Sequence, residues 1–341
     1  MSQKTSPPAK SARRSHFPWK SAIGWFVALA VIFMTAFGFL FVAERRSPIQ
    51  PTATIFVSPH PDDEFQMWSL VEDRPEEYKV FVFLTLGEET RFCDPDVYEE
   101  ALQVNLGEIP ASPTPEGRAS KACEEARVAS TLGYFQQMSI ADETVPGDFS
   151  DPKEFSLPGD GPVEVCRTDS DVTSCDPRFR EVSVFHDELG RGAVVFFNLG
   201  DGDLTAPEAT LAIETLVSSR EEWGLAAERP VGPIVGAFAN DGTRCFSYPH
   251  PDHLVVRDVL WNIDFGAGPQ LGATCYVGRS QRMSSIVSTA SSEASFALDE
   301  DGVRVGAHGL HYGWLHADAY PVSRLQNSLF HRLQSFWVRF N

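Results

Sequence analysis

The chain has 341 residues, with 28 Lys and Arg against 47 Asp and Glu, a formal net charge of −19 and 43% hydrophobic residues. This length suits one large domain or two small ones, with ample apolar material for a core. The acidic balance argues against a nucleic-acid partner, because binding to phosphates requires a basic surface. The composition is also unlike that of collagen, disordered chains or small disulfide scaffolds.

The N-terminal 43 residues differ from this average. Residues 1–20 contain five basic and no acidic residues, and residues 21–43 form an uncharged apolar stretch. About 20 apolar residues in a helix cross a hydrocarbon core roughly 30 Å thick, so residues 21–43 are predicted to be a single transmembrane signal anchor. The positive-inside rule places residues 1–20 in the cytoplasm and the catalytic part of the chain outside it. A cleaved signal peptide is the alternative, although the apolar run is longer than is usual for one.

All six cysteines follow the predicted anchor, which agrees with an oxidising compartment. The chain has no Cys-x-x-Cys pair, so neither a thioredoxin-type redox site nor a zinc knuckle is indicated. Among the possible disulfides we favour Cys166–Cys175, because a polar segment separates these two residues. Buried free thiols are the alternative.

After a polar linker, residues 44–52, apolar runs alternate with helical patterns. The predicted strands are Ala53–Val57, Val80–Leu86, Ala193–Leu199 and Val231–Ala239, and the predicted helices are Glu64–Val71, Gly117–Leu132, Thr205–Ser219 and Pro251–Asn262. Apolar strands that alternate with helices predict a Rossmann-like α/β domain over residues 53–265, with a mostly parallel sheet flanked by helices. Gly133 is expected to end the second helix, and Thr205 to cap the third.

Two segments are less regular. Residues 135–184 are rich in Asp, Ser, Pro and Gly, and are expected to form a surface loop or small insertion. Residues 266–341 are expected to form a C-terminal extension packed on the domain. Within it, apolar residues at helical spacing predict an amphipathic terminal helix over Ser323–Phe340.

The tripeptide His-Pro-Asp occurs twice, each time after a predicted strand. His60-Pro61-Asp62-Asp63-Glu64 follows the first strand, and His250-Pro251-Asp252-His253 follows the fourth after a loop. Proline suits the first position of a helix, so both motifs indicate strand–loop–helix junctions. Such junctions lie at the carboxyl ends of parallel strands, where binding sites are built. We therefore expect the two motifs to converge.

The converging side chains form a candidate zinc site. Catalytic zinc takes three protein ligands and an open position, and two histidines with one carboxylate are an established set, which His60, Asp63 and His253 supply. Asp62 is then the candidate base for an attacking water, and His250 is placed to stabilise an oxyanion or to protonate a leaving amine. Acidic first turns and lone histidine pairs are common without a metal. The occurrence of both motifs at matching junctions favours the zinc site.

The motifs Val57-Ser-Pro-His-Pro-Asp-Asp-Glu64 and His250-Pro-Asp-His253 resemble the two signatures of the N-acetylglucosaminyl-phosphatidylinositol de-N-acetylase (PIG-L/LmbE-like) family of zinc-dependent deacetylases. Weaker similarities lie at residues 84–89, 125–133 and 198–202, so that the resemblance covers roughly residues 53–265.

The resemblance implies a role for each residue of the two motifs. Zinc would bind His60, Asp63 and His253, and Asp62 would be the general base. His250 matches the family's electrophile or acid, and Tyr248 matches a tyrosine that polarises the amide carbonyl in some members. The implied reaction is hydrolysis of the N-acetyl group of a glucosamine-type sugar, with release of acetate.

Glu88 and Glu89 are further candidates for contact with sugar hydroxyls. The alternative is that both are exposed carboxylates of a loop.

The sequence therefore predicts a membrane-anchored, outward-facing zinc N-deacetylase that acts on N-acetylglucosamine in a glycolipid or glycoconjugate. One alternative is a zinc amidase that cleaves a larger amide of an amino sugar. Another is a non-catalytic carbohydrate-binding surface protein, although a binding module has no need of a base beside a metal. The oligomeric state stays open.

Overall fold

The computed structural model describes residues 51–72, 74–97, 116–159, 166–169, 172–175, 177–239, 248–274, 286–291 and 333–339. All of them belong to a unit that begins at Pro51. The predicted anchor, residues 21–43, lies outside this part of the chain. Among the described residues, no helix is both long and apolar enough to cross a membrane.

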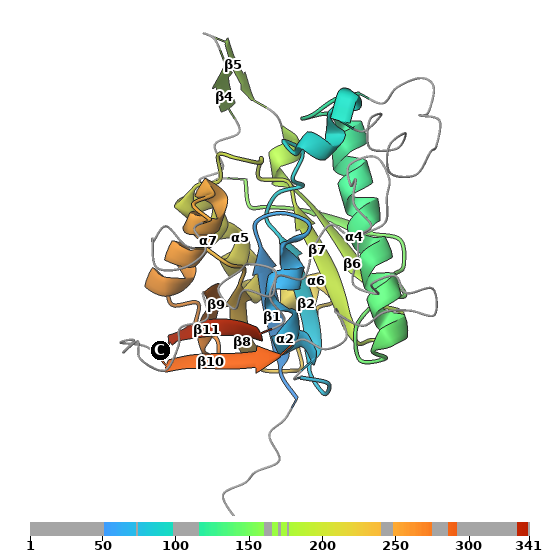
Figure 1. Ribbon diagram of the computed structural model, residues 1–341, viewed down its shortest axis with the longest axis vertical. Helices are drawn as coiled ribbons and strands as arrows, with labels where there is room; N and C mark the ends of the chain where they lie inside the picture. Colours follow the sequence, from blue (N-terminus) through green and yellow to red (C-terminus); the bar gives the residue numbers. More distant parts are fainter. Residues whose placement is uncertain are drawn as a thin grey trace, which may run out of the picture. The chain divides into compact units, whose positions relative to one another are not determined.

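Parallel strands form the centre of the main sheet (Figure 1). They are β1 (Ala53–Ser58), β2 (Tyr78–Phe83), β7 (Gly192–Phe197), β8 (Val231–Gly236) and β9 (Gln270–Thr274). Their spatial order is β9-β8-β1-β2-β7, and every neighbouring pair among them is parallel. The prediction of an α/β fold with a mostly parallel sheet is confirmed.

Antiparallel strands widen the sheet at both edges, so the sheet is mixed. Strands β6 (Glu181–His186) and β3 (Lys153–Ser156) continue it beyond β7. Strands β11 (Leu333–Arg339) and β10 (Ile286–Ser291) continue it beyond β9. Residues 135–184 thus contribute two strands to the main sheet, besides a separate hairpin of β4 (Cys166–Asp169) and β5 (Val172–Cys175).

The predicted terminal helix is wrong over Leu333–Arg339, which forms β11; residues 323–332 lie outside the described part of the chain. Phe336 and Trp337 are both buried, and they join core clusters on opposite faces of the sheet. This alternation is that of a strand. Pairing with β9 and burial of the two aromatic rings outweigh the helical spacing of the apolar residues.

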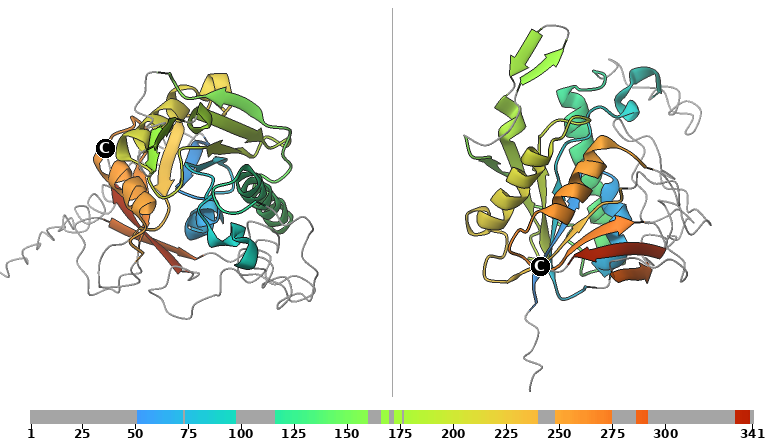
Figure 2. Two further views of the ribbon diagram at one scale, coloured as in Figure 1. Left: turned by 90° about the horizontal axis from the view of Figure 1, so that it is seen from above. Right: turned by 90° about the vertical axis from the view of Figure 1, so that its left-hand side faces the viewer.

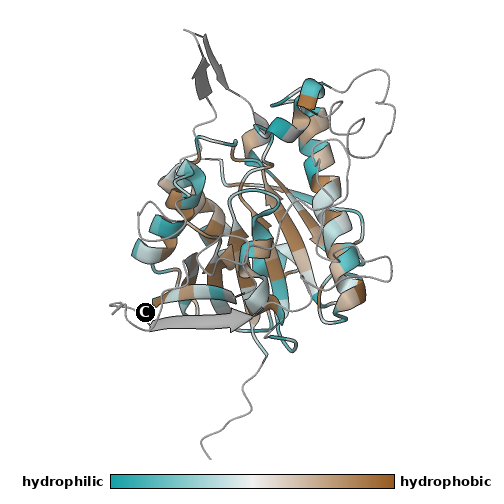
Figure 3. Ribbon diagram, viewed as in Figure 1, coloured by the Kyte–Doolittle hydropathy of each residue, from teal (hydrophilic) through white to brown (hydrophobic). Residues whose placement is uncertain are grey.

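Helices cover both faces of the sheet (Figures 1 and 2). The helices α2 (Trp68–Glu72) and α4 (Lys121–Ala141) share a core cluster with Phe56 of β1, whereas α5 (Ala206–Ser218), α6 (Arg220–Trp223) and α7 (Pro251–Asn262) share the other cluster with Ile55. Short 3-10 helices are η1 (Asp63–Met67), η2 (Arg91–Cys93) and η4 (Pro177–Arg180). The apolar central strands between these layers are visible in Figure 3.

Three predicted helix features can be compared with the structure. Helix α7 has the predicted bounds, and Thr205 caps α5 in a capping box with Glu208. Helix α4 does not end at Gly133 but continues to Ala141. Glycine costs about 1 kcal/mol within a helix. Here the buried residues Tyr134 and Phe135 that follow it hold the helix against the sheet.

The order of the strands positions the site. From β1 the chain passes to β2 and β7 on one side, and then returns to β8 on the other side of β1. The carboxyl ends of β1 and β8 therefore flank a topological switch point, which is where open α/β sheets bind their ligands.

Candidate metal centre

The first motif follows the carboxyl end of β1 in a tight turn. Pro61 does not begin a helix as predicted, because Asp62 is the residue that precedes η1 and it has a φ of 100°. A non-glycine residue in the left-handed region is strained by about 1–3 kcal/mol, and such residues concentrate at functional sites. The turn places His60 and Asp63, both buried, on the same side of the strand end.

The second motif begins α7, as predicted. His250 is the N-cap residue, Pro251 takes the first helical position and His253 lies in the first turn. The Nδ1 atom of His253 lies 2.6 Å from the carbonyl oxygen of Phe238, in the segment after β8. A ring that donates from Nδ1 to this carbonyl directs the lone pair of Nε2 toward the site.

The predicted ligands His60, Asp63 and His253 converge. Asp63 Oδ2 lies 3.2 Å from His60 Nδ1 and 3.1 Å from His253 Nε2. Burial opposes the charged form of Asp63, but contacts with His253 and His60 lower its pKa well below the usual range. The anionic oxygen between two imidazoles is a donor set that suits a divalent transition metal.

Gln66 joins the two motifs. Its Nε2 donates to Asp63 Oδ1 over 2.6 Å, and its Oε1 accepts from the backbone N–H of Phe238 over 2.6 Å. Since Phe238 also contacts His253, the amide of Gln66 fixes the carboxylate and the imidazole relative to each other. Outer contacts of this kind orient metal ligands.

Two further carboxylates approach the other ring nitrogen of His60. Its Nε2 lies 3.0 Å from Asp252 Oδ2 and 3.1 Å from Asp201 Oδ1. Asp252 also accepts hydrogen bonds from the backbone N–H groups of Gly202 and Leu204. Burial disfavours a charged His60, but the contacts with Asp201, Asp252 and Asp63 raise its pKa well above the ordinary value. The three carboxylates therefore favour a positive charge at this place, which a bound cation would supply instead of the proton on His60.

Two groups of side chains have donor atoms close enough to hold one metal ion. They are His60 with His250 and His253, and His60 with Asp201 and Asp252; neither group includes the predicted ligand Asp63. Buried Nδ1 of His250 has no hydrogen-bond partner among the described residues. An unpartnered buried nitrogen beside further imidazoles and carboxylates fits a metal site. These residues therefore could hold a metal ion.

His250 and Tyr248 complete the wall of the centre. The ring centroid of His250 lies 4.6 Å from that of His60, and the ring of Tyr248 lies 4.7 Å from that of His253. Burial and the neighbouring His60 and His253 lower the pKa of His250. Burial and the nearby carboxylates raise the pKa of Tyr248, so both side chains are neutral near pH 7.

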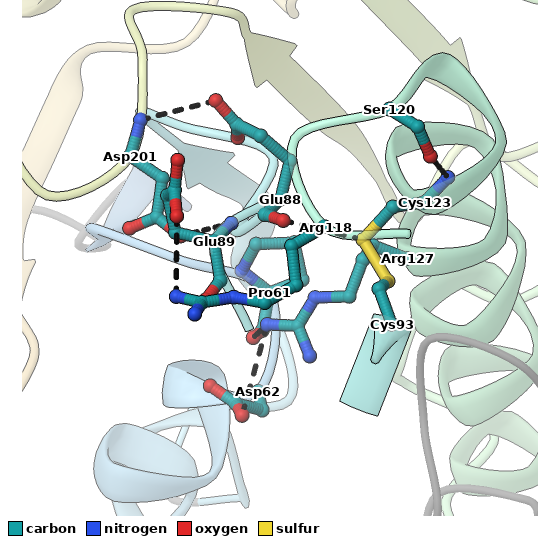
Figure 4. Close-up of a disulfide and its surroundings, with 10 residues drawn as sticks. All are labelled: Pro61, Asp62, Glu88, Glu89, Cys93, Arg118, Ser120, Cys123, Arg127 and Asp201. Carbon is teal, nitrogen blue, oxygen red and sulfur yellow. Dashed lines mark hydrogen bonds and ion pairs between the residues drawn. A yellow bond between two sulfur atoms is a disulfide. The ribbon is translucent and has the colours of Figure 1, made fainter. Parts of the chain in front are cut away.

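Asp62, between the predicted ligands His60 and Asp63 in the sequence, lies close to a buried arginine of α4. Arg127 Nη2 donates to the carbonyl oxygen of Pro61 over 2.6 Å and lies 3.8 Å from Asp62 Oδ2 (Figure 4). Burial raises the pKa of Asp62 well above the ordinary value, although the charge of Arg127 opposes this shift. Arg127 thus holds the turn that presents Asp62.

Glu88 and Glu89 separate in the structure (Figure 4). Glu88 is buried, its Oε1 accepts from the backbone N–H of Asp201 over 3.2 Å, and burial together with Asp201 raises its pKa to about 7. The carboxylate of Glu89 pairs with Arg118 at 3.1 Å on the surface. The carboxylate of Glu88 is therefore part of the buried surroundings of the centre, whereas Glu89 reaches them only through its backbone N–H, which donates to Asp201 Oδ2 over 2.9 Å.

A disulfide lies beside this loop. Cys93 at the end of η2 and Cys123 in the first turn of α4 are bonded, with a Cα–Cα distance of 5.7 Å (Figure 4). The sequence analysis did not single out this pair. Cys166 and Cys175 face each other across the β4–β5 ladder. Their side chains lie outside the described part of the chain, so their disulfide stays a prediction.

Sequence reasoning assigned no role to Gln66, Arg127, Asp201 or Asp252. Asp252 lies inside the second motif, and Asp201 lies between two glycines in the turn after β7. Their positions after strands could therefore have marked both as candidate site residues. Gln66 and Arg127 gave no signal, because only the packing of η1 and α4 brings them to the centre.

Comparisons with protein-family models, with curated proteins and with solved structures find no match for this chain. A proposal for the function therefore rests on the two motifs and on the arrangement of their residues in the structure.

Proposed function

We propose that the protein is a zinc-dependent hydrolase that removes the N-acetyl group from an N-acetylglucosamine-type sugar of a glycolipid or glycoconjugate. In this proposal, residues 21–43 anchor it in a membrane with its catalytic domain outside the cytoplasm, and the chain is a member of the PIG-L/LmbE-like family. The convergence of His60, Asp63 and His253 next to Asp62 and His250 is the observation that carries the proposal.

His60, Asp63 and His253 would hold the zinc ion. When bound, zinc supplies Lewis-acid activation of water and of the amide carbonyl. Gln66 and Asp252 orient the ligands through the hydrogen bonds described above.

The protons of the reaction are assigned to Asp62 and His250. A carboxylate oxygen of Asp62 takes a proton from the attacking water, and the raised pKa of this carboxyl favours that transfer. Neutral His250 donates a hydrogen bond to the oxygen on which negative charge develops. The proton held on Asp62 then passes to the amine nitrogen as the C–N bond breaks, which leaves acetate and the free amino sugar.

The direct test uses the full chain, loaded with zinc, and measures acetate released from N-acetylglucosaminides. We expect release that depends on zinc. Full zinc occupancy without acetate from any acetylated amino sugar would contradict the proposal.

Two substitutions separate metal binding from turnover. Asn is isosteric with Asp and tolerates a positive φ, so Asp62→Asn should retain zinc and lose activity by at least about 100-fold, in the range of general-base contributions. His253→Ala should lose zinc itself, as measured by metal analysis. Wild-type activity in Asp62→Asn would exclude Asp62 as the base.

A further inference from the structure

A hollow between α4 and the sheet takes no part in the reaction described above. It has a volume of about 520 Å³ and lies between the N-terminal half of α4 and strands β6 and β7. Val128 and Leu132 of α4 form one wall, and Phe185 and Phe196 of the sheet form the other. Pockets for small organic ligands have volumes of about 300–1,000 Å³, so the hollow is large enough for one.

The walls of the hollow are apolar and incompletely covered. Val128, Leu132 and Phe185 pack against the core but are only partly buried. They contrast with Tyr134, Phe135 and Met138 in the second half of α4, which are fully covered by the sheet. An apolar group placed in the hollow would remove these surfaces from water, which is favourable by roughly 25 cal/mol per Å².

One residue of the lining belongs to the turn that carries Asp201 of the metal centre. Asn198, which lines it, is 6% exposed, and its Oδ1 has no hydrogen-bond partner among the described residues. Asn198 stands in the same turn as Asp201, which contacts His60. A buried carbonyl oxygen without a donor is costly, so a ligand hydroxyl or N–H at this position would satisfy it.

The rim of the hollow is acidic. It carries the carboxylates of Glu124, Glu125, Glu154 and Glu181 and the ammonium of Lys121. Lys121, which lies 3.6 Å from Glu125, is the one basic residue among the described residues that line the hollow, whereas four are acidic. Like charges repel at this range, and the rim therefore disfavours an anionic ligand.

We propose that the hollow is a subsite for an uncharged, apolar group attached to the amino sugar, and that Asn198 accepts a hydrogen bond from a sugar hydroxyl. This inference rests on the proposed deacetylase function and narrows its substrate class. The preferred substrate is an N-acetylated amino sugar joined directly to an alkyl or aryl group, rather than one whose neighbouring group is a phosphate or carboxylate.

The kinetic test uses the full zinc-loaded chain and three N-acetylglucosaminides that differ only in the aglycone: methyl, phenyl and 4-carboxyphenyl. From the apolar area of a phenyl ring, kcat/KM for acetate release should be about tenfold higher for phenyl than for methyl. The 4-carboxyphenyl compound should lose most of this gain. Equal values for methyl and phenyl, or a preference for 4-carboxyphenyl, would overturn the subsite.

Two substitutions to Gln on α4 test whether the preference for the phenyl compound arises in the hollow. Leu132→Gln places an amide in the wall of the hollow, and the ratio of kcat/KM for phenyl to that for methyl should fall to about one. Ile140→Gln is the matched control, because Ile140 is 84% exposed on the same helix, and the ratio should be retained. Val128→Trp, which fills the hollow, should lower the same ratio if Leu132→Gln does not fold.

A binding measurement separates the subsite from the reaction. Phenyl glucoside has no amide, and its binding to the full-length His253→Ala chain, followed by ligand NMR, requires no turnover. If Leu132→Gln abolishes this binding, Ile140→Gln retains it, and the zinc-loaded wild type releases no acetate from any glucosaminide, the hollow is a binding site and the deacetylase is refuted. Acetate release with no effect of the aglycone would refute the subsite and leave the deacetylase standing.

Discussion

Gln66 is a single uncharged residue on which both halves of the candidate metal centre depend. It donates to Asp63 from its nitrogen and accepts from Phe238 at its oxygen. Gln66→Met keeps the length of the side chain but removes both hydrogen bonds. Losses of outer hydrogen bonds of this kind typically weaken metal affinity by about 10–100-fold. Competition for zinc with a chromogenic chelator measures this effect.

The control for this substitution is Gln137→Met, because Gln137 is exposed on α4. It should bind zinc like the wild type. Unchanged zinc affinity in folded Gln66→Met would show that the bridge does not position the ligands.

Asp187, which lies away from the metal centre, is expected to make the free energy of unfolding depend on pH. Burial opposes its charged form, but hydrogen bonds from the Arg191 side chain and from the backbone N–H of Gly147 lower its pKa to about 2. In an unfolded chain the pKa of an Asp carboxyl is about 3.9. Its contribution, about 2 kcal/mol of unfolding free energy, is therefore present above pH 4 and is lost as the pH falls from about 4 to 2.

Urea unfolding of the wild type and of Asp187→Asn between pH 2 and 6 tests this contribution. The two curves should converge at low pH and separate above pH 4, whereas Asp151→Asn, at an exposed position, should follow the wild type throughout. A constant difference between the wild type and Asp187→Asn would contradict the assigned cause.

At the level of elements, the Cys93–Cys123 disulfide holds η2 against the first turn of α4. The bond closes a loop with a sequence separation of 30 residues. For a loop of this size, the chain-entropy model gives a stabilisation of about 3–4 kcal/mol. The paired substitution Cys93→Ser and Cys123→Ser should lower the free energy of unfolding by about this amount in urea titrations without reductant.

The same substitution also tests a link to the site. Ser120 caps α4, the backbone N–H of Ala119 donates to the carbonyl oxygen of Glu88, and Arg127 of α4 holds the turn at Asp62. A less firmly held α4 should therefore lower kcat more than it lowers zinc occupancy. Loss of stability with unchanged kcat would restrict the disulfide to a structural role.

The elements also show what sequence can and cannot predict. The four predicted strands lie within three residues of their observed bounds, and α5 and α7 nearly or fully match the prediction, whereas α4 runs nine residues further than predicted. Strand β9, with the sequence Gln-Leu-Gly-Ala-Thr, has too few apolar residues to be noticed, yet pairing with β8 holds it in the sheet. Leu333–Arg339 forms a strand because it pairs with β9. This pairing joins distant segments, so the local sequence pattern does not predict it.

For the site, the two motifs gave the residues that converge at the switch point, because strand ends and helix starts can be located from local patterns. The contributions of Gln66, Arg127 and Glu88 depend on how η1, α4 and the loop after β2 pack together. Such contacts join residues far apart in the sequence, and spacing does not predict them.

At the scale of the whole molecule, the switch point has a consequence for how the protein matures. His60 and Asp63 follow the first strand, whereas His253 belongs to the helix after β8, so the chain must be synthesised through most of the sheet before the three residues can meet. An ion held by all three would act as a cross-link between β1 and α7. It would favour the completed fold over any partly formed one, by about 2.7 kcal/mol at a free ion concentration 100 times its Kd. The supply of metal to newly made chains would then determine how many of them reach the native state.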